Sequence, residues 1–433
     1  MEKCSTYHEL YLHIRSAALR GRTLYIVSGP GCGKTAFMSY AAKKFVNEHG
    51  EGQAIYVYSS MYMPEELAGI PVLNQSEYVE IQGQKFPIVR IAPQKYAVEA
   101  SKSLCPILIV FDEVNTGSAG NLSGPMLRIL AEGCIGEIAL DQTRIARIAC
   151  MNPAEMSGGR KMRMAISGRG TFIYFEPSVQ EWARDFVTYW GNPPKLSFCN
   201  EIIPEEKWMR ARMLVSQFVL ANPDYFLVYP EEDSYGVWID SKNKIHVAGY
   251  PTPRSWDYVS RTLAVYDVYI SPSSTNNSSF ADAIFRELSG DVGPEAAAKF
   301  INYAKNSILP DPFEVFKDPS ILSASLNKIK DMAYVLVPLM AGMSHYCIEN
   351  NNIVPYCEVL NMLYQSKIPK DIISQAVYVL SDKLNTSSSS KKLYYTFSNY
   401  IKTNLSDFSN QLTTYRDALI RELNKREKAQ KGQ

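Results

Sequence analysis

The stretch TLYIVSGPGCGKT, residues 23–35, decides how the rest of the chain is interpreted. Apolar, β-prone residues run into a turn with glycines at every second position, and residues 34–50 then show helical spacing. The pattern G-x-x-x-x-G-K-[ST] is met except at its first position, where the chain has Ser28. Glycines let a loop turn its N–H groups inward, and a helix N-terminus behind the loop favours anions.

We therefore predict a phosphate-binding loop in which the small Ser28 is tolerated. A lysine reaching the β- and γ-phosphates and a hydroxyl holding Mg²⁺ complete such a site. The predicted nucleotide-binding residues are Gly29, Pro30, Gly31, Cys32, Gly33, Lys34 and Thr35. The alternative is a structural turn between a strand and a helix.

A second motif, ILIVFDEVN, places Asp112 and Glu113 at the end of an apolar strand. In a nucleotide site the first acid binds Mg²⁺ through water, together with Thr35, and the second orients the attacking water. Two adjacent acids at a strand end could instead cap a loop.

The guanine-reading motif N-K-x-D is absent, since residues 327–330 read NKIK. The predicted ligands are ATP and Mg²⁺, and the predicted activity is ATP hydrolysis.

Strands and helices alternate over residues 1–178, which predicts an α/β fold with a five-stranded parallel sheet. The expected strands are 23–29, 54–60, 105–113, the end of 136–152, and 170–177. Hairpins are expected at 78–91 and 136–148. Helical spacing dominates afterwards, so we expect a lid region at 179–270 and a helical C-terminal region at 271–433, including a helix from Leu405 to Leu419.

An ordered series of motifs resembles the MoxR branch of the AAA+ ATPases, in the helix-2-insertion and presensor-1-hairpin group. The two motifs above resemble Walker A and Walker B of that family. PEELAGIPV at 64–72 is similar to the segment before the helix-2 insertion, and GPMLRILAEGCIG, with Glu132, to the helix after Walker B. ACMNPAEMSGGRKMRMAISGRGTFIYF and GYPTPRSWDYVS resemble the segments that carry sensor 1 and sensor 2. The resemblance covers residues 20–265.

The resemblance implies roles for three further residues beside the catalytic Glu113. Asn152 would be sensor 1, at the end of the strand that lies between the Walker A and Walker B strands. Arg169 would be the arginine finger that enters a neighbouring subunit's site, and Arg254 would be sensor 2. The family usually has an aromatic residue after the finger, whereas this chain has Gly170. Because of that departure, Arg160 and Arg163 are alternative candidates for the arginine finger.

A finger supplied by a neighbour implies a homo-oligomeric ring, most often a hexamer. Members of this branch are thought to remodel or assemble protein clients, often with a von Willebrand factor A domain partner. The chain has no D-x-S-x-S motif, so such a partner would be a separate protein.

The alternative is a nucleic-acid motor of the restriction or replication type, which needs basic pore residues. The expected hairpins mix basic and acidic residues, so nucleic acid is not favoured. A third alternative, a switch that barely hydrolyses, conflicts with an intact Glu113.

Composition also limits which partners, cellular compartment and metal sites we expect. The 433 residues carry a formal net charge of +1, which gives no overall attraction to nucleic acid or anionic membranes. No apolar run approaches the roughly 18 residues that a membrane span needs. The scattered cysteines predict reduced thiols in a cytoplasmic protein. His345, Cys347 and Cys357 lack a fourth metal ligand, and we interpret them as packing residues.

Overall fold

The computed structural model describes residues 3–49, 53–63, 66–67, 69–115, 126–156, 168–191, 193–230, 236–239, 242, 244–266, 278–306, 309–326, 328–386 and 390–412. The chain divides into two compact units, Met1–Ser178 and Val179–Gln433. Within the described residues, no helix combines the length and the apolar character that crossing a bilayer requires.

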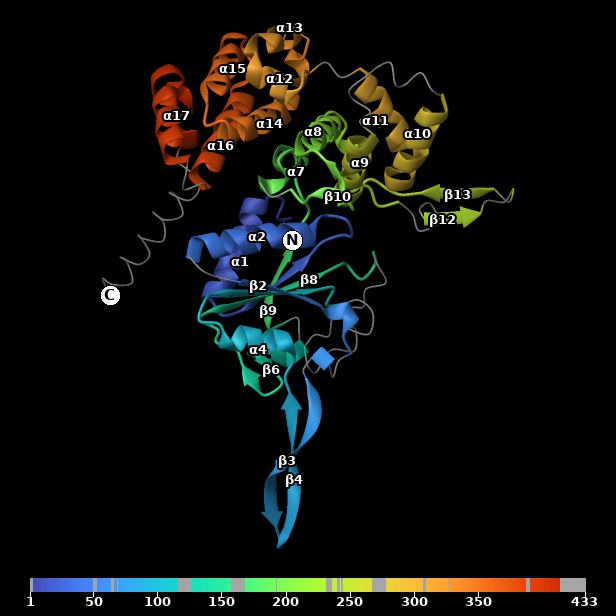
Figure 1. Cartoon of the computed structure of the whole chain (residues 1–433), viewed down its shortest axis with the longest axis vertical. Helices are drawn as coiled ribbons and strands as arrows, with labels where there is room; N and C mark the ends of the chain where they lie inside the picture. Colours follow the sequence, from blue (N-terminus) through green and yellow to red (C-terminus); the bar gives the residue numbers. More distant parts are fainter. Residues whose placement is uncertain are drawn as a thin grey trace. The chain divides into compact units, whose positions relative to one another are not determined.

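A five-stranded parallel sheet forms the centre of unit 1 (Figure 1). Its strands are β1 (Thr23–Val27), β2 (Gln53–Tyr58), β5 (Ile107–Asp112), β8 (Ile145–Met151) and β9 (Gly170–Tyr174). They lie in the order β2-β5-β8-β1-β9, and every neighbouring pair is parallel. Every residue of β5 and β8 is buried, as expected for parallel strands covered on both faces. The predicted α/β fold with five parallel strands is confirmed.

Helices cover the two faces of this sheet. α1 (Tyr7–Leu19) and α2 (Lys34–His49) lie on one face, and α4 (Lys95–Lys102) lies on the other (Figure 1). α1 begins where the Thr6 hydroxyl accepts a hydrogen bond from the Glu9 amide at 3.1 Å. Its buried residues recur at intervals of three and four: Tyr7, Leu10, Tyr11, Ile14 and Ala17. A short 3₁₀ turn (Ser59–Met61) and a π-helical turn (Arg128–Glu132) are further helical elements of unit 1.

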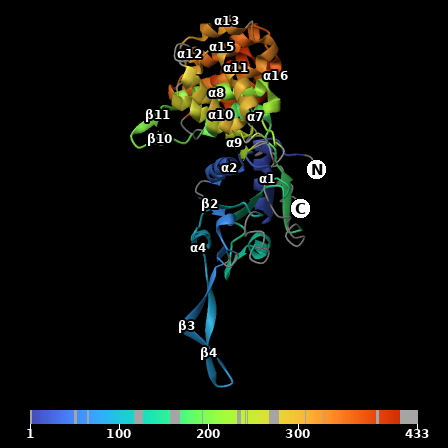
Figure 2. The same ribbon diagram turned by 90° about the vertical axis from the view of Figure 1, so that its right-hand side faces the viewer.

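Two hairpins leave the sheet, and both differ from their predicted bounds. β3 (Ile70–Ile81) and β4 (Gln84–Ala92) form a long ribbon that starts earlier than residue 78 and projects from unit 1 (Figures 1 and 2). β6 (Cys134–Ile135) and β7 (Ile138–Ala139) form a hairpin much shorter than 136–148, so that prediction is wrong. The physical reason is Asp141, whose carboxylate accepts bonds from the amide and hydroxyl of Thr143 and makes a turn.

Unit 2 is mostly helical, as predicted. Its helices are α7 (Val179–Phe186), α8 (Glu205–Ala221), α9 (Pro253–Tyr266), α10 (Ser278–Val292), α11 (Pro294–Lys305), α12 (Pro312–Lys317), α13 (Ser323–Leu326), α14 (Leu336–Glu349), α15 (Val354–Gln365), α16 (Lys370–Thr386) and α17 (Lys391–Asn404). Shorter 3₁₀ turns are Tyr189–Gly191, Pro223–Tyr225, Pro319–Leu322, Lys330–Val335 and Ser406–Leu412. Two small hairpins, β10 (Leu196–Phe198) with β11 (Glu201–Ile203) and β12 (Gly236–Ile239) with β13 (Ile245–Ala248), were not predicted.

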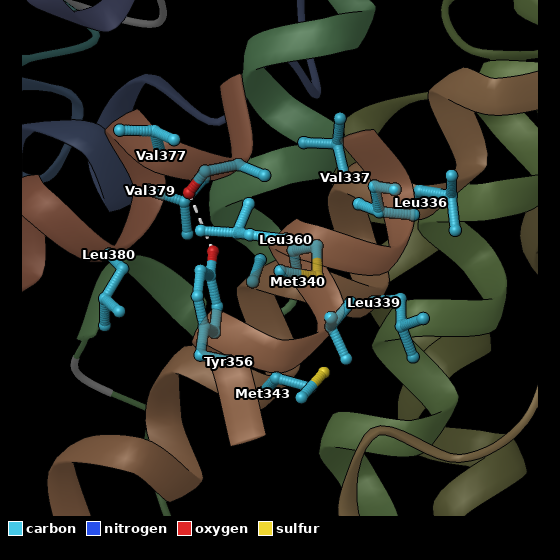
Figure 3. Packing of buried hydrophobic residues seen from close by; sticks show 14 of the residues in the cluster. Leu336, Val337, Leu339, Met340, Met343, Tyr356, Leu360, Val377, Val379 and Leu380 are labelled. Carbon is cyan, nitrogen blue, oxygen red and sulfur yellow. Dashed lines mark hydrogen bonds between the residues drawn. The ribbon is translucent and has the colours of Figure 1, made fainter. Parts of the chain in front are cut away.

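The core of unit 2 explains why these helices stay together. Apolar side chains of α14, α15 and α16 converge there, with Met340 and Leu360 near its centre (Figure 3). The Tyr356 hydroxyl lies within this core and donates to the Ala376 carbonyl at 2.7 Å, which satisfies its buried polar end. Leu405 and Phe408 belong to the same core, although α17 ends before Leu405 and residues 406–412 form a 3₁₀ helix. Residues 413–419 of the expected tail helix lie outside the described residues.

Candidate nucleotide-binding site

Three neighbouring parallel strands end at the same edge of the sheet. β8 lies between β1 and β5, with Val27 opposite Met151 and Phe111 opposite Ala149. The backbone beyond each end is tied to β8, since the Ser28 amide donates to the Met151 carbonyl and the Val114 amide donates to the Cys150 carbonyl, both at 3.1 Å. The segments that follow the three strands therefore meet at one place, the position where open α/β sheets bind ligands.

The loop after β1 has the backbone that a phosphate loop requires. Gly31 and Gly33 have φ of 78° and 80°, in the left-handed region that favours glycine. Ser28 is fully buried and is not among the residues with positive φ, so serine adopts this conformation without strain. Serine at the first position of the motif therefore fits the backbone of this loop. The loop ends at the N-terminus of α2, whose dipole favours an anion.

Lys34, the first residue of α2, lies over this loop. Its ammonium donates to the carbonyls of Ser28 at 2.8 Å and Gly29 at 3.0 Å, and to Oδ1 of Asn152 at 2.6 Å. Asn152 directly follows β8, so the amide of one strand end and the lysine of the neighbouring loop are in contact. The predicted sensor residue and the predicted phosphate-binding lysine are therefore brought together, and all three acceptors of Lys34 named here are neutral oxygens.

Thr35 and Asp112 form the second half of the cluster. The Thr35 hydroxyl donates to Oδ2 of Asp112 at 2.7 Å, and the Glu113 amide donates to Oδ1 of the same carboxylate at 3.0 Å. Hydroxyl and carboxylate oxygens are the hard ligands that Mg²⁺ prefers, so this donor set fits the expected metal. Glu113 has φ of 54°, which is uncommon for a residue with a side chain. Such strain is typical of functional positions.

The thiol of Cys150 lies beneath these charges in the sheet. Burial raises its pKa well above the ordinary range, and the nearby Asp112 carboxylate raises it further, while Lys34 acts in the opposite direction. The thiol therefore stays neutral and serves as a small apolar residue of the strand. None of the eight cysteines forms a disulfide bond.

Asn115 is a site residue that the sequence analysis missed. It is 5% exposed, and its Nδ2 donates to the backbone carbonyl of Asn152 at 2.7 Å. It thus ties the segment after β5 to the segment after β8, beneath the side chain that contacts Lys34. A signal was present, because Asn115 closes the stretch FDEVN in which Asp112 and Glu113 were recognised.

The predicted arginines do not join this cluster. Arg169 precedes β9, and Gly170 lies opposite Thr23 at the start of β1, so Arg169 lies at the edge of the sheet opposite the loop. Its side chain is 45% exposed and lies 3.9 Å from a carboxylate oxygen of Glu132. Arg160 and Arg163 lie outside the described residues.

Arg254 belongs to unit 2. It is exposed and is the second residue of α9, which begins at Pro253 as the sequence predicts.

No protein-family model matches the chain, and no curated protein matches it. Among solved structures, the chain is similar to the Aeropyrum pernix ORC2 protein in ADPNP-ADP complexes, at 12% identity, 88% coverage of this chain, 94% coverage of that chain and a TM-score of 0.31. It is also similar to NtrX from Brucella abortus in complex with ADP, at 11% identity, 81% and 67% coverage, and a TM-score of 0.32.

Proposed function

We propose that this protein is an ATP hydrolase of the AAA+ type, with Lys34, Thr35, Asp112, Glu113 and Asn152 at its site. The observation that carries the proposal is the contact of Lys34 with Asn152, beside that of Thr35 with Asp112, at the shared edge of β1, β8 and β5. Four side chains from three separate motifs meet there, and each is of the type that its proposed role needs.

Each residue has a separate task in this proposal. Loop amides and Lys34 would bind the phosphates; Lys34 would exchange its neutral acceptors for charged phosphate oxygens, which form stronger hydrogen bonds. Thr35 and Asp112 would hold Mg²⁺, which neutralises charge on the phosphates. Glu113 would orient the attacking water, and Asn152 would bind the γ-phosphate or that water.

The position of Arg169 in the structure supports a ring of subunits as part of this proposal. Arg169 lies far along the sheet from its own loop and is largely exposed, so it could serve only a neighbour's site. We propose that subunits form a ring, most often a hexamer, in which Arg169 neutralises charge developing on the phosphoryl group of the adjacent subunit. The exposed Arg254 would act as sensor 2, in its own or an adjacent site.

We propose a protein client, as in the MoxR branch, with a separate von Willebrand factor A domain protein as partner. Two arginines on or near the hairpins are paired with acids, which favours a protein client over nucleic acid. Arg90 lies 2.9 Å from Glu77 and 3.5 Å from Glu137, and Arg144 lies 2.7 Å from Asp141. Such pairs leave little net charge for counterion release on a phosphate backbone. The free cysteines are compatible with a cytoplasmic place of action.

Hydrolysis and binding measurements test the proposal. Glu113→Gln is expected to bind ATP like the unaltered protein and to lose turnover, whereas Lys34→Ala is expected to lose binding itself. Glu99→Gln is the matched control, because Glu99 is a half-buried glutamate of α4 that pairs with Lys95, outside the site. Unchanged hydrolysis in Glu113→Gln would contradict the site. Stimulation by DNA rather than by a candidate partner protein would favour the nucleic-acid motor.

A further inference from the structure

The β3–β4 hairpin carries large apolar side chains that remain substantially exposed in the described structure. Eight such residues on it are exposed: Ile70, Val72, Leu73, Tyr78, Val79, Ile81, Phe86 and Val89. The hairpin is a two-stranded sheet of its own and projects from the rest of unit 1 in both views (Figures 1 and 2). An isolated two-stranded hairpin is marginally stable in water, so apolar side chains on it gain by being covered.

These residues lie on both faces of the ribbon. Directly opposite residues of an antiparallel pair share a face, and neighbours along a strand alternate. Val79 is opposite Phe86, and Leu73 is opposite Val89. Face A is therefore defined by Ile70, Val72, Val79, Ile81 and Phe86, and face B by Leu73, Tyr78 and Val89.

We infer that this hairpin is a contact between copies of the chain, in which face A of one subunit packs on face B of the next. The inference rests on the proposed function, which requires a ring. A head-to-tail ring uses two different surfaces of each subunit, and a ribbon that is apolar on both faces provides them. Contact with a client would need only one apolar face.

The charges of the hairpin permit such packing. Arg90, on face A, is paired with Glu77 at 2.9 Å. Glu80 lies opposite Lys85 on face B, so the two acids of the hairpin are balanced by two bases. Two copies brought together would meet no like-charge repulsion from an uncompensated group, whereas a polyanion would meet no net positive field.

Paired substitutions separate the two faces. Val79→Thr with Phe86→Thr alters face A, and Leu73→Thr with Val89→Thr alters face B; threonine keeps a high β-propensity. The matched control is Val237→Thr with Val247→Thr, because these residues are opposite one another on the β12–β13 hairpin and are 71% and 61% exposed. Thermal unfolding verifies that each variant folds.

Native mass spectrometry over a concentration series, in Glu113→Gln protein with Mg²⁺ and ATP, gives the readout. Each face variant is expected to raise the protein concentration needed for assembly by roughly tenfold or more, because two apolar contacts are lost at every interface. The control pair is expected to assemble like the unaltered protein. A mixture of the two face variants should form mixed dimers, since one intact pair of faces remains between them.

Assembly of both face variants at the unaltered concentration would overturn the inference and leave the ring intact. Normal assembly with weakened binding of a candidate partner would also overturn it and would assign the hairpin to that partner. If the unaltered protein stays monomeric with ATP, both this inference and the proposed ring fail, whereas the ATP site can still be judged from the nucleotide-binding measurements.

Discussion

Asn115 offers a direct test of how the strand ends cooperate. We predict that Asn115→Ala slows ATP hydrolysis while leaving nucleotide affinity nearly unchanged. Asn115 donates to the backbone carbonyl of Asn152, so its loss should misplace the Asn152 side chain with little effect on the phosphate loop. The residue acts through its neighbour and is a positioning residue.

The size of the effect follows from the lost hydrogen bond. The substitution removes a 2.7 Å bond to a carbonyl in a place where Asn115 itself is 5% exposed. An unsatisfied buried carbonyl costs about 1–3 kcal/mol. If the bond is needed in the transition state, kcat falls by about 5- to 150-fold, since each 1.36 kcal/mol is a factor of ten. Asn115→Asp should be slower still, because a carboxylate is an acceptor that cannot donate to the carbonyl.

Single-turnover hydrolysis and equilibrium ATP binding, measured on the same preparations, separate kcat from affinity. Asn350→Ala is the control, because its Nδ2 also donates to a backbone carbonyl, that of Tyr346 at 2.9 Å, but in unit 2. The reasoning is refuted if folded Asn115→Ala hydrolyses ATP within about twofold of the unaltered rate, or if the whole loss lies in affinity.

Three further predictions concern other parts of the chain. Arg169→Ala should keep ATP binding and lose on the order of 10³-fold in hydrolysis, with partial recovery on mixing with Glu113→Gln subunits; no recovery would transfer the role to Arg160 or Arg163. Gly170→Ala should destabilise the protein by about 3 kcal/mol in urea unfolding, because its Cβ would lie 2.1 Å from the Tyr25 ring, whereas Gly290→Ala, with no atom within 4 Å, should not. Burial lowers the pKa of His345 to about 4, below its unfolded value near 6.5, so stability present above pH 6.5 should fall by on the order of 1–2 kcal/mol as the pH drops toward 4; a His345→Gln variant with the same pH slope would contradict this.

The sheet and the site cluster were predictable for a common reason. Buried parallel strands are continuous apolar runs, and β1, β5 and β8 each stand out as such in the sequence. Asp112 ends β5 and Asn152 follows β8, so predicting these strands also predicts where the two residues lie, while the glycine-rich loop after β1 places Lys34 at the start of α2. Asn115 lies in the same stretch as Asp112 and Glu113, but its residue type alone does not indicate a role that acts through the backbone of Asn152.

The hairpins were harder to predict because turn chemistry decides their length. The β6–β7 hairpin ends early since Asp141 bonds to Thr143, a contact that period-two alternation does not reveal. In unit 2, the short strands of β10–β11 and β12–β13 interrupt helical sequence and contribute few residues each, too few for a periodic pattern.

Gly170 is a position whose residue type is explained by the packing of its neighbours. The family resemblance leads one to expect an aromatic residue after the finger, and the structure has an aromatic ring at this place, supplied by the neighbouring strand. Tyr25 of β1 is fully buried, approaches the backbone of Gly170, and stacks on Phe172 with 4.4 Å between ring centroids. A side chain at position 170 and the Tyr25 ring would occupy the same volume, so only one of them can be present. The glycine therefore follows from the packing of β1 against β9, and the role of Arg169 stays a prediction.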